Sequence, residues 1–244
     1  MSKAIYPPLD MPKPVTNNIW IVDSGPLRLA GMPVPVRMTV IKLRNGELIL
    51  HSPTQFSFAL KAQLDSLGRI AYFLAPNTAH WTFIKEWQAH YPQAQCWAVP
   101  GLGERPAVQK SGLHIDREFR DGAPEEWAEE IEIILVRGKG LVEADFFHRA
   151  SKTLVLTDLI VNLEPQKLGP TMRLGARLVG ALAPNGKAPV YARALVKGGG
   201  KEAEAAGRRL LALKPERVLF AHGHWHEHDG TAKLEQSLDW LVTK

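Results

Sequence analysis

The chain has 244 residues, of which 45% are hydrophobic and 23% are charged, a composition typical of a globular protein with a sizeable core. Its single cysteine, Cys96, excludes an internal disulfide and agrees with a reducing cytoplasm. No stretch approaches the roughly 18 apolar residues of a spanning helix, and the opening MSKAIYPPLDMPKP lacks the apolar run of a signal peptide. We therefore expect a cytoplasmic protein with no membrane partner.

The formal net charge is +5, with basic residues scattered along the chain. Nucleic-acid binding usually requires a focused stripe of Lys and Arg with interleaved aromatic residues, and the densest basic run here is GRRLLALKPER. A mildly basic, solvated surface is the first interpretation of this charge, and an anionic small-molecule substrate is the second. Nucleic acid is not an expected partner.

In the first half, the order of elements predicts a hairpin and then alternating helices and strands. An Asn-Gly pair between the apolar runs of MTVIKLRNGELILHS predicts a β-hairpin. Apolar spacing then predicts a helix ending at Gly68, a buried strand IAYFLAP, a helix from Asn77 or Thr78 to the residue before Pro92, and a buried strand AQCWAVP. Helices that connect buried strands are typical of a parallel sheet.

The second half is predicted to hold several strands and two clear helices. IEIILVRG, EADFFH, TLVLT and RVLFAH are predicted strands, while KEAEAAGRRLLALKP and KLEQSLDWLV are predicted helices. Residues 165–200, rich in Gly, Pro and basic side chains, contain one helical stretch near Arg173–Leu182. We expect this segment to be an insertion or a lid.

Four predicted strands end in polar residues that suit catalysis. His51 follows ELIL, His80 follows IAYFLAPNTA, Asp158 follows TLVLT and His222 follows RVLFA. Loops at the C-terminal edge of such strands commonly build active sites. Imidazole and carboxylate are common zinc ligands, and an open catalytic site needs three of them plus a water. His80, Asp158 and His222 therefore form a chemically adequate metal-ligand set.

Each of these residues also has a structural interpretation. His80 lies near a predicted helix start, where partly exposed polar residues are common, and Asp158 could cap a turn. His222 could be a buried histidine that bonds the backbone. For His51 and His148, we favour the structural interpretation.

Residues 222–228 place a histidine at every second position, namely His222, His224, His226 and His228. If this run stayed extended, all four side chains would face one side. Gly223 and the turn signal EHDG instead predict that the strand ends near His222. This prediction leaves His226 and His228 in a solvated loop.

Other catalytic chemistries lack their sequence signals. The chain has no Gly-x-Ser-x-Gly elbow and no Gly-x-x-x-x-Gly-Lys-Ser/Thr loop, which weakens a serine hydrolase and excludes a nucleotide P-loop. Cys96 lies within an apolar strand, where a thiol nucleophile is not expected.

The stretches GPLRLAGMPVPVRMTV, APNTAHWTFIKEW, FFHRASKTLVLTDL and AHGH resemble a branch of the metallo-β-lactamase superfamily classed as a domain of unknown function, DUF4336. The resemblance covers roughly residues 18–230. It implies an αββα sandwich, in which two mixed sheets face each other with helices outside. We expect one domain over 1–244, with an N-terminal extension over 1–17. The resemblance also implies hydrolysis by one or two metal ions.

The resemblance is incomplete at the metal ligands. The superfamily has His-x-His-x-Asp-His after a buried strand, where this chain has APNTAHWT and keeps only His80. Asp158 matches the bridging aspartate and His222 the final histidine. The resemblance thus implies a reduced site for one weakly held divalent ion, zinc first with iron or manganese as alternatives, or no ion at all.

Two functions remain open from the sequence. In the first, a metal-bound hydroxide attacks a small ester, lactone or thioester, with Asp158, His224 and His51 as catalytic residues and either histidine transferring the proton. In the second, the chain is a degenerate, non-catalytic member of the fold that binds a ligand or a partner. The loss of the first histidine motif favours the second function.

Overall fold

The computed structural model describes residues 4–29 and 32–242, so residues 1–3 of the predicted extension, 30–31 within the first matching stretch, and 243–244 lie outside the described part. The chain divides into two compact units. We call them the N-terminal unit, residues 6–24 and 37–120, and the C-terminal unit, whose described residues are 4–5, 25–29, 32–36 and 121–242. The prediction of a single domain stays a prediction.

A seven-stranded mixed sheet occupies the first half of the chain, with its strands adjacent in chain order. Strands β3 and β4 pair antiparallel, while β4, β5, β6 and β7 run parallel. The strands are β1 (Lys13–Thr16), β2 (Ile19–Leu29), β3 (Met32–Lys42), β4 (Glu47–His51), β5 (Arg69–Ala75), β6 (Gln95–Ala98) and β7 (Arg117–Glu118). The predicted hairpin is β3–β4, and its turn contains Gly46 at a φ of +85° that favours glycine.

Helices α1 (Phe58–Leu67), α2 (Ile84–His90) and α3 (Pro106–Ser111) connect these strands. Helix α1 ends before Gly68, as predicted. Helix α2 begins at Ile84, later than predicted. The Asn77 side chain accepts the backbone N–H of Ala79 at 2.9 Å and of His80 at 3.0 Å, as a helix N-cap does, but residues 78–83 form bends and turns, so His80 lies in a turn before the helix.

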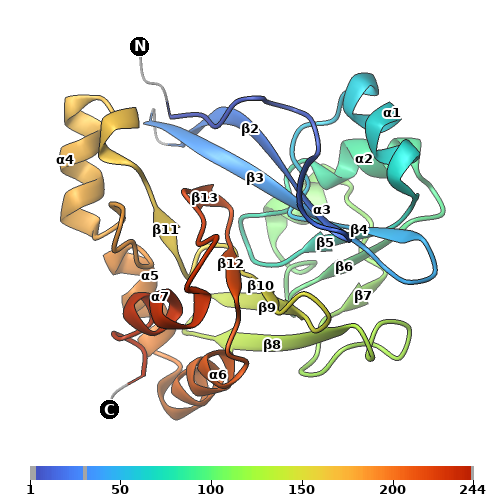
Figure 1. Ribbon diagram of the computed structural model, residues 1–244. Coiled ribbons are helices and arrows are strands. Elements are labelled where there is room, and N and C mark those ends of the chain that lie inside the picture. The colour runs from blue at the N-terminus through green and yellow to red at the C-terminus, as the bar shows by residue number, and fades with distance from the viewer. Residues whose placement is uncertain (1–3, 30–31, 243–244) are drawn as a thin grey trace. The chain divides into compact units, whose positions relative to one another are not determined.

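The C-terminal unit contains a four-stranded sheet in the order β12-β10-β9-β8 and a two-stranded pair β11-β13. Its strands are β8 (Ile131–Arg137), β9 (Val142–His148), β10 (Thr153–Val155), β11 (Val161–Asn162), β12 (Arg217–Leu219) and β13 (His222–Gly223). Its helices are η1 (Pro165–Lys167), α4 (Pro170–Val179), α5 (Val190–Lys197), α6 (Gly200–Ala212) and α7 (Gly230–Ser237). The expected insertion therefore holds η1 and the two α-helices α4 and α5, of which α5 was not predicted (Figure 1).

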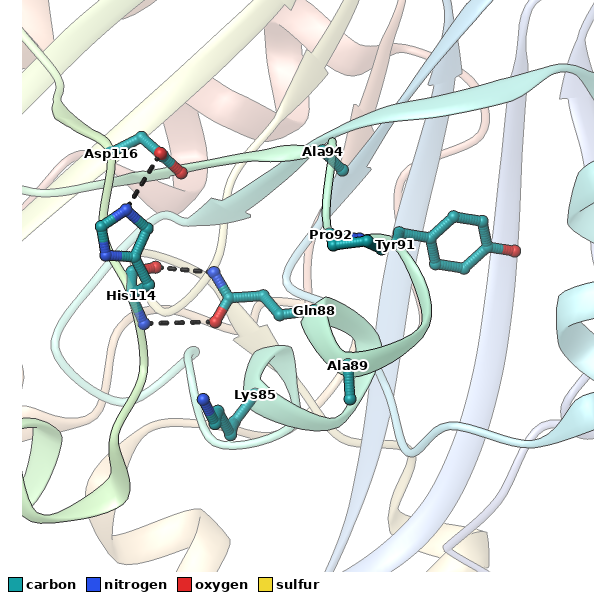
Figure 2. A pocket seen from close by; sticks show the side chains of 8 residues that line it. All are labelled: Lys85, Gln88, Ala89, Tyr91, Pro92, Ala94, His114 and Asp116. Carbon is teal, nitrogen blue, oxygen red and sulfur yellow. Dashed lines mark hydrogen bonds and ion pairs between the residues drawn. The ribbon is translucent and has the colours of Figure 1, made fainter.

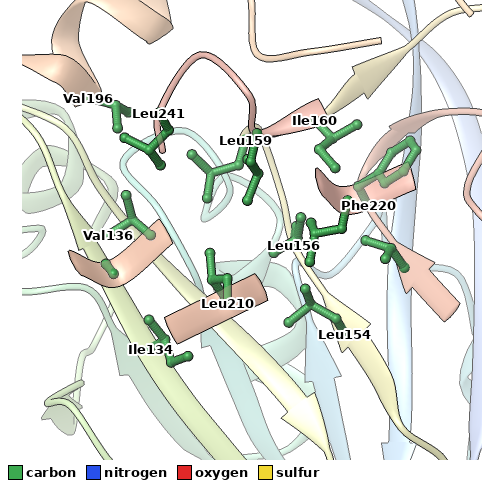
Figure 3. Packing of buried hydrophobic residues seen from close by; sticks show 14 of the residues in the cluster. Ile134, Val136, Leu154, Leu156, Leu159, Ile160, Val196, Leu210, Phe220 and Leu241 are labelled. Carbon is green, nitrogen blue, oxygen red and sulfur yellow. The ribbon is translucent and has the colours of Figure 1, made fainter. Parts of the chain in front are cut away.

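Apolar side chains from the sheet and from α5, α6 and α7 form the core of the C-terminal unit (Figure 3). Ile134 of β8 and Leu210 of α6 belong to this cluster, as α6 packs on β8. Full burial of each Leu, Ile or Phe side chain contributes roughly 1.5–3 kcal/mol. This packing fixes the sheet whose strand ends carry Asp158 and His222. Among the described residues, no helix combines the length and apolar character needed to cross a bilayer.

Candidate metal site

Asp158 and His222 follow two neighbouring parallel strands of the C-terminal unit. Strands β10 and β12 pair with Val155 opposite Leu219, and each polar residue comes three positions after its strand. Because parallel strands end at the same edge of a sheet, this register carries both side chains to one place. The structure therefore brings together two of the predicted ligands.

The His222 side chain is held at both ring nitrogens. Nδ1 donates to the backbone carbonyl of Pro35 at 2.7 Å, and Nε2 lies 3.3 Å from Oδ1 of Asp158. A backbone carbonyl can only accept, so Nδ1 carries a proton and Nε2 of the neutral ring presents its lone pair. Two electron-rich atoms facing each other at this distance are suited to share a cation, either a proton or a metal ion.

Glu143 of β9 is a buried residue that fixes the loop carrying Asp158, and sequence reasoning missed it. Its carboxylate accepts the backbone N–H groups of Thr157 at 2.7 Å, Asp158 at 2.9 and 3.0 Å, and Leu159 at 3.3 Å. Burial, followed by the Asp158 charge, raises the pKa of Glu143, while these backbone hydrogen bonds oppose the rise. The available signal was two acidic residues in the otherwise apolar strand VEADFFH, since charged side chains are rarely buried without a partner.

Asp145 lies two residues beyond Glu143 and is also buried. Burial, followed by the neighbouring Glu143 carboxyl, raises the pKa of Asp145 well above its usual range. The backbone N–H groups that the Glu143 carboxylate accepts are therefore the contacts that favour its ionised form.

His80 and His51 belong to the N-terminal unit. Nδ1 of His80 lies 2.6 Å from the Ser52 hydroxyl, which fixes the orientation of the ring. His51, at the end of β4, is buried, and this burial, followed by the His80 charge, lowers its pKa to about 3. Because His51 is neutral near pH 7, proton uptake at this ring is unfavourable. Its catalytic role and the ligand role of His80 stay predictions.

The remaining histidines of the run divide into exposed and buried residues. His224 and His228 are exposed. His226 is buried, so the prediction that it lies in a solvated loop is wrong. The chain turns back after β13, so His226 pairs with Val218 and packs edge-on against Phe220 at 5.2 Å between ring centroids. His226 is thus a core histidine.

His148 has the structural role expected of it. The residue is buried at the end of β9, and its Nδ1 lies 2.8 Å from the Ser151 hydroxyl in the turn before β10. This contact stabilises the turn between β9 and β10.

A separate pocket of about 220 Å³ lies within the N-terminal unit. Figure 2 shows the Gln88 amide paired with the backbone of His114, and His114 Nε2 in contact with Asp116 at 3.2 Å. Asp116 also accepts the Cys96 backbone N–H at 2.7 Å. The polar groups here already bond one another, and none of the pocket's lining residues is a predicted site residue.

Comparison with known families identifies most of the chain. A family model described as a domain of unknown function (DUF4336) matches residues 16–177. No curated protein matches the chain. The match includes the first three stretches on which the predicted resemblance rests, together with Glu143 and Asp158. It ends within α4, before the fourth stretch, AHGH, which contains His222.

Solved metallo-β-lactamases share the fold. A metallo-β-lactamase from Pontibacter korlensis is 13% identical, with a TM-score of 0.63 over 96% of this chain and 99% of that chain. The DIM-1 metallo-β-lactamase exposed to ceftazidime is 12% identical, with a TM-score of 0.65 over 99% and 98%. The FIM-1 metallo-β-lactamase from Pseudomonas aeruginosa, in a mono-zinc form, is 12% identical, with a TM-score of 0.62 over 95% and 94%. The predicted metallo-β-lactamase fold, with mixed sheets and helices, is confirmed.

Proposed function

Because the chain belongs to the DUF4336 family and has the metallo-β-lactamase fold, we propose that it is a metal-dependent hydrolase with a reduced metal site. The proposed substrate is a small ester, lactone or thioester. The fold supports a hydrolytic site without defining the substrate, since one fold hosts many activities. The support for a metal comes from Asp158 and His222.

The separation of His222 Nε2 and Asp158 Oδ1 carries the proposal. Two donor atoms bound at about 2.0–2.1 Å to a tetrahedral ion lie roughly 3.3–3.4 Å apart, and these two atoms lie 3.3 Å apart. The Pro35 carbonyl holds the proton on Nδ1 of His222, as an outer hydrogen bond typically does for a metal-binding imidazole. The donor set therefore fits zinc, with iron or manganese as alternatives.

The proposed ligands are His80, Asp158 and His222, the set predicted from the sequence. A bound divalent ion would lower the pKa of a water and polarise a carbonyl group. His80, Asp158 and His222 would hold the ion, and the exposed His224 would accept or return a proton.

The proposed substrate is anionic, because one segment of the C-terminal unit carries basic residues without acidic ones. Residues 165–201 contain seven Lys and Arg residues and no Asp or Glu, whereas the rest of the chain has 23 basic and 25 acidic residues. Helix α5 of this segment lies close enough for the Asp158 charge to act with burial in raising the pKa of Tyr191. A cationic segment beside a site raises the local concentration of anions.

Metal content tests the proposal. The untagged protein, loaded with zinc and desalted, is expected to retain stoichiometric zinc by atomic emission, and His80→Ala, Asp158→Asn and His222→Ala are each expected to lose it. His228→Ala removes an exposed histidine of the same run and should keep the zinc. A metal-free wild type, or zinc retained in His222→Ala, would contradict the proposal.

Turnover separates the hydrolase from the non-catalytic alternative. The zinc-loaded wild type is expected to hydrolyse members of a panel of esters, lactones and thioesters, and His222→Ala to lose that activity. The alternative is favoured by the single histidine, His80, in APNTAHWT. Stoichiometric zinc with no hydrolysis across the panel would support that alternative.

A further inference from the structure

Strand β9 places two acidic side chains in the interior of the C-terminal unit. Glu143 is 1% exposed and Asp145 is 0% exposed. Their strand partners are Val136 and Ile134, two members of the apolar cluster on this side of the sheet. Burying a carboxylate is costly unless hydrogen bonds compensate for its lost hydration, so the position of Glu143 requires an explanation.

Three consecutive backbone amides supply the compensation. The N–H groups of Thr157, Asp158 and Leu159 all point at the Glu143 carboxylate. The preceding amide, Leu156, still follows the sheet and donates to Leu219 at 2.9 Å. Beyond the last hydrogen bond between β10 and β12, the backbone N–H groups therefore donate to Glu143 instead of to the sheet. Glu143 thus fixes the backbone from which the Asp158 side chain projects.

We propose that Glu143 is a positioning residue that holds Asp158 against His222. The inference rests on the proposed function in one respect, since it assigns the held geometry to metal binding. A ligand has to be kept within about 0.5 Å of its productive position by supporting contacts. His222 is held by the Pro35 carbonyl, and Glu143 gives Asp158 the matching support through its own backbone.

The strand offers a matched pair of substitutions. Glu143→Gln keeps the shape of the side chain but replaces one acceptor oxygen with an NH₂ donor facing the loop amides. Asp145→Asn changes a buried carboxyl on the same strand and the same face by the same chemistry. A general effect of altering a buried acid would appear in both variants. An effect that comes from positioning Asp158 would appear only in Glu143→Gln.

Metal-free protein gives the first readout. We expect hydrogen exchange at the Thr157, Asp158 and Leu159 amides to be slow in the wild type and in Asp145→Asn, and at least 10-fold faster in Glu143→Gln. The ring ¹⁵N signals of His222 should shift toward those of Asp158→Asn only in Glu143→Gln. Unprotected wild-type amides would overturn the inference even if Glu143→Gln failed to fold, and so would unchanged exchange and ring signals in a folded Glu143→Gln.

Zinc affinity, measured by competition with a chelator, gives the second readout. Loss of an outer-shell partner typically weakens metal binding by about 10–100-fold, so we expect this loss in Glu143→Gln and less than a 3-fold change in Asp145→Asn. Equal affinities for the wild type and Glu143→Gln would overturn the inference. A wild type that binds no zinc would contradict the proposed function instead, and the exchange and ring signals would still decide whether Glu143 holds the loop.

Discussion

Val155 of β10 and Leu219 of β12 lie directly opposite each other in a parallel strand pair. Asp158 and His222 each follow three residues later, so strand register determines the distance between them. A one-residue slip of either strand would turn its side chains to the other face. The contact between Asp158 and His222 is therefore a property of the sheet and not of loop sequence alone.

Gly223→Ala is expected to disturb this arrangement directly beside His222. Gly223 has a φ of +98°, and a Cβ atom there would lie 2.2 Å from the backbone oxygen of Asn162. Backbone strain and overlap with β11 should lower the free energy of unfolding by about 2–4 kcal/mol. Urea denaturation measures this loss, and zinc competition should show weakened binding.

Gly175→Ala is the control for a glycine in the same unit. Gly175 lies inside α4, and a Cβ atom there would meet no described atom within 4 Å apart from the adjacent residues and the backbone of its own helix. Alanine should stabilise this helix by about 0.5–1 kcal/mol. Similar losses in both variants would contradict the assignment of strain to Gly223.

The sequence was sufficient to predict that Asp158 and His222 lie close together, because their signal is local. Asp158 and His222 each follow a short apolar run of the length expected of a buried strand, and such runs pair with one another in a sheet. The alternation of buried strands and helices in residues 54–100 predicted a sheet with connecting helices, whereas the metallo-β-lactamase fold was predicted from the family resemblance.

The sequence was not sufficient where a residue's role depends on distant backbone. Glu143 accepts hydrogen bonds from backbone amides 14 to 16 positions away. No spacing rule connects an acidic residue on one strand with the loop that follows a different strand. His226 was predicted to be solvated because Gly223 and the turn signal EHDG indicated that the strand ends near His222, yet the chain after β13 brings His226 into a bridge with Val218 of β12. Helix α2 begins only at Ile84, although the Asn77 side chain accepts two of the amides that a helix beginning there would expose.

His226 is expected to destabilise the protein in acid. Burial, followed by the positive charges of Lys233 and His224, lowers its pKa to about 4. The unfolded chain takes up a proton below about pH 6.5 while the folded state does not, so the free energy of unfolding falls as the pH falls from about 6.5 to 4. The fall attributable to this residue is roughly 3 kcal/mol at most.

His226→Leu tests this pH dependence. Urea denaturation at several pH values between 4 and 7.5 should show a shallower loss of stability in the variant than in the wild type. His228→Leu changes an exposed histidine two residues away and should keep the wild-type slope. Parallel curves for the wild type and His226→Leu would show that this histidine titrates equally in both states.

Leu210→Ala is expected to cost about 2–5 kcal/mol of unfolding free energy. Leu210 is 0% exposed and packs within the cluster between α6 and the sheet (Figure 3), so its removal leaves a cavity. Leu178→Ala on α4, where the side chain is 75% exposed, should change stability by less than about 0.5 kcal/mol. Chemical denaturation of both variants measures the difference, and equal values would mean that α6 does not support this core.

Cys96 is expected to resist thiol reagents while the protein is folded. The residue is buried in β6, and burial, followed by the Asp116 charge, raises its pKa to about 12. The thiolate is the reactive species, so a disulfide reagent at pH 8 should react only in denaturant. Asp116→Asn removes the Asp116 charge, which raises the thiol pKa less than burial does, so the thiol should stay unreactive in this variant. Labelling of the native wild type within seconds would show that this strand is open to solvent.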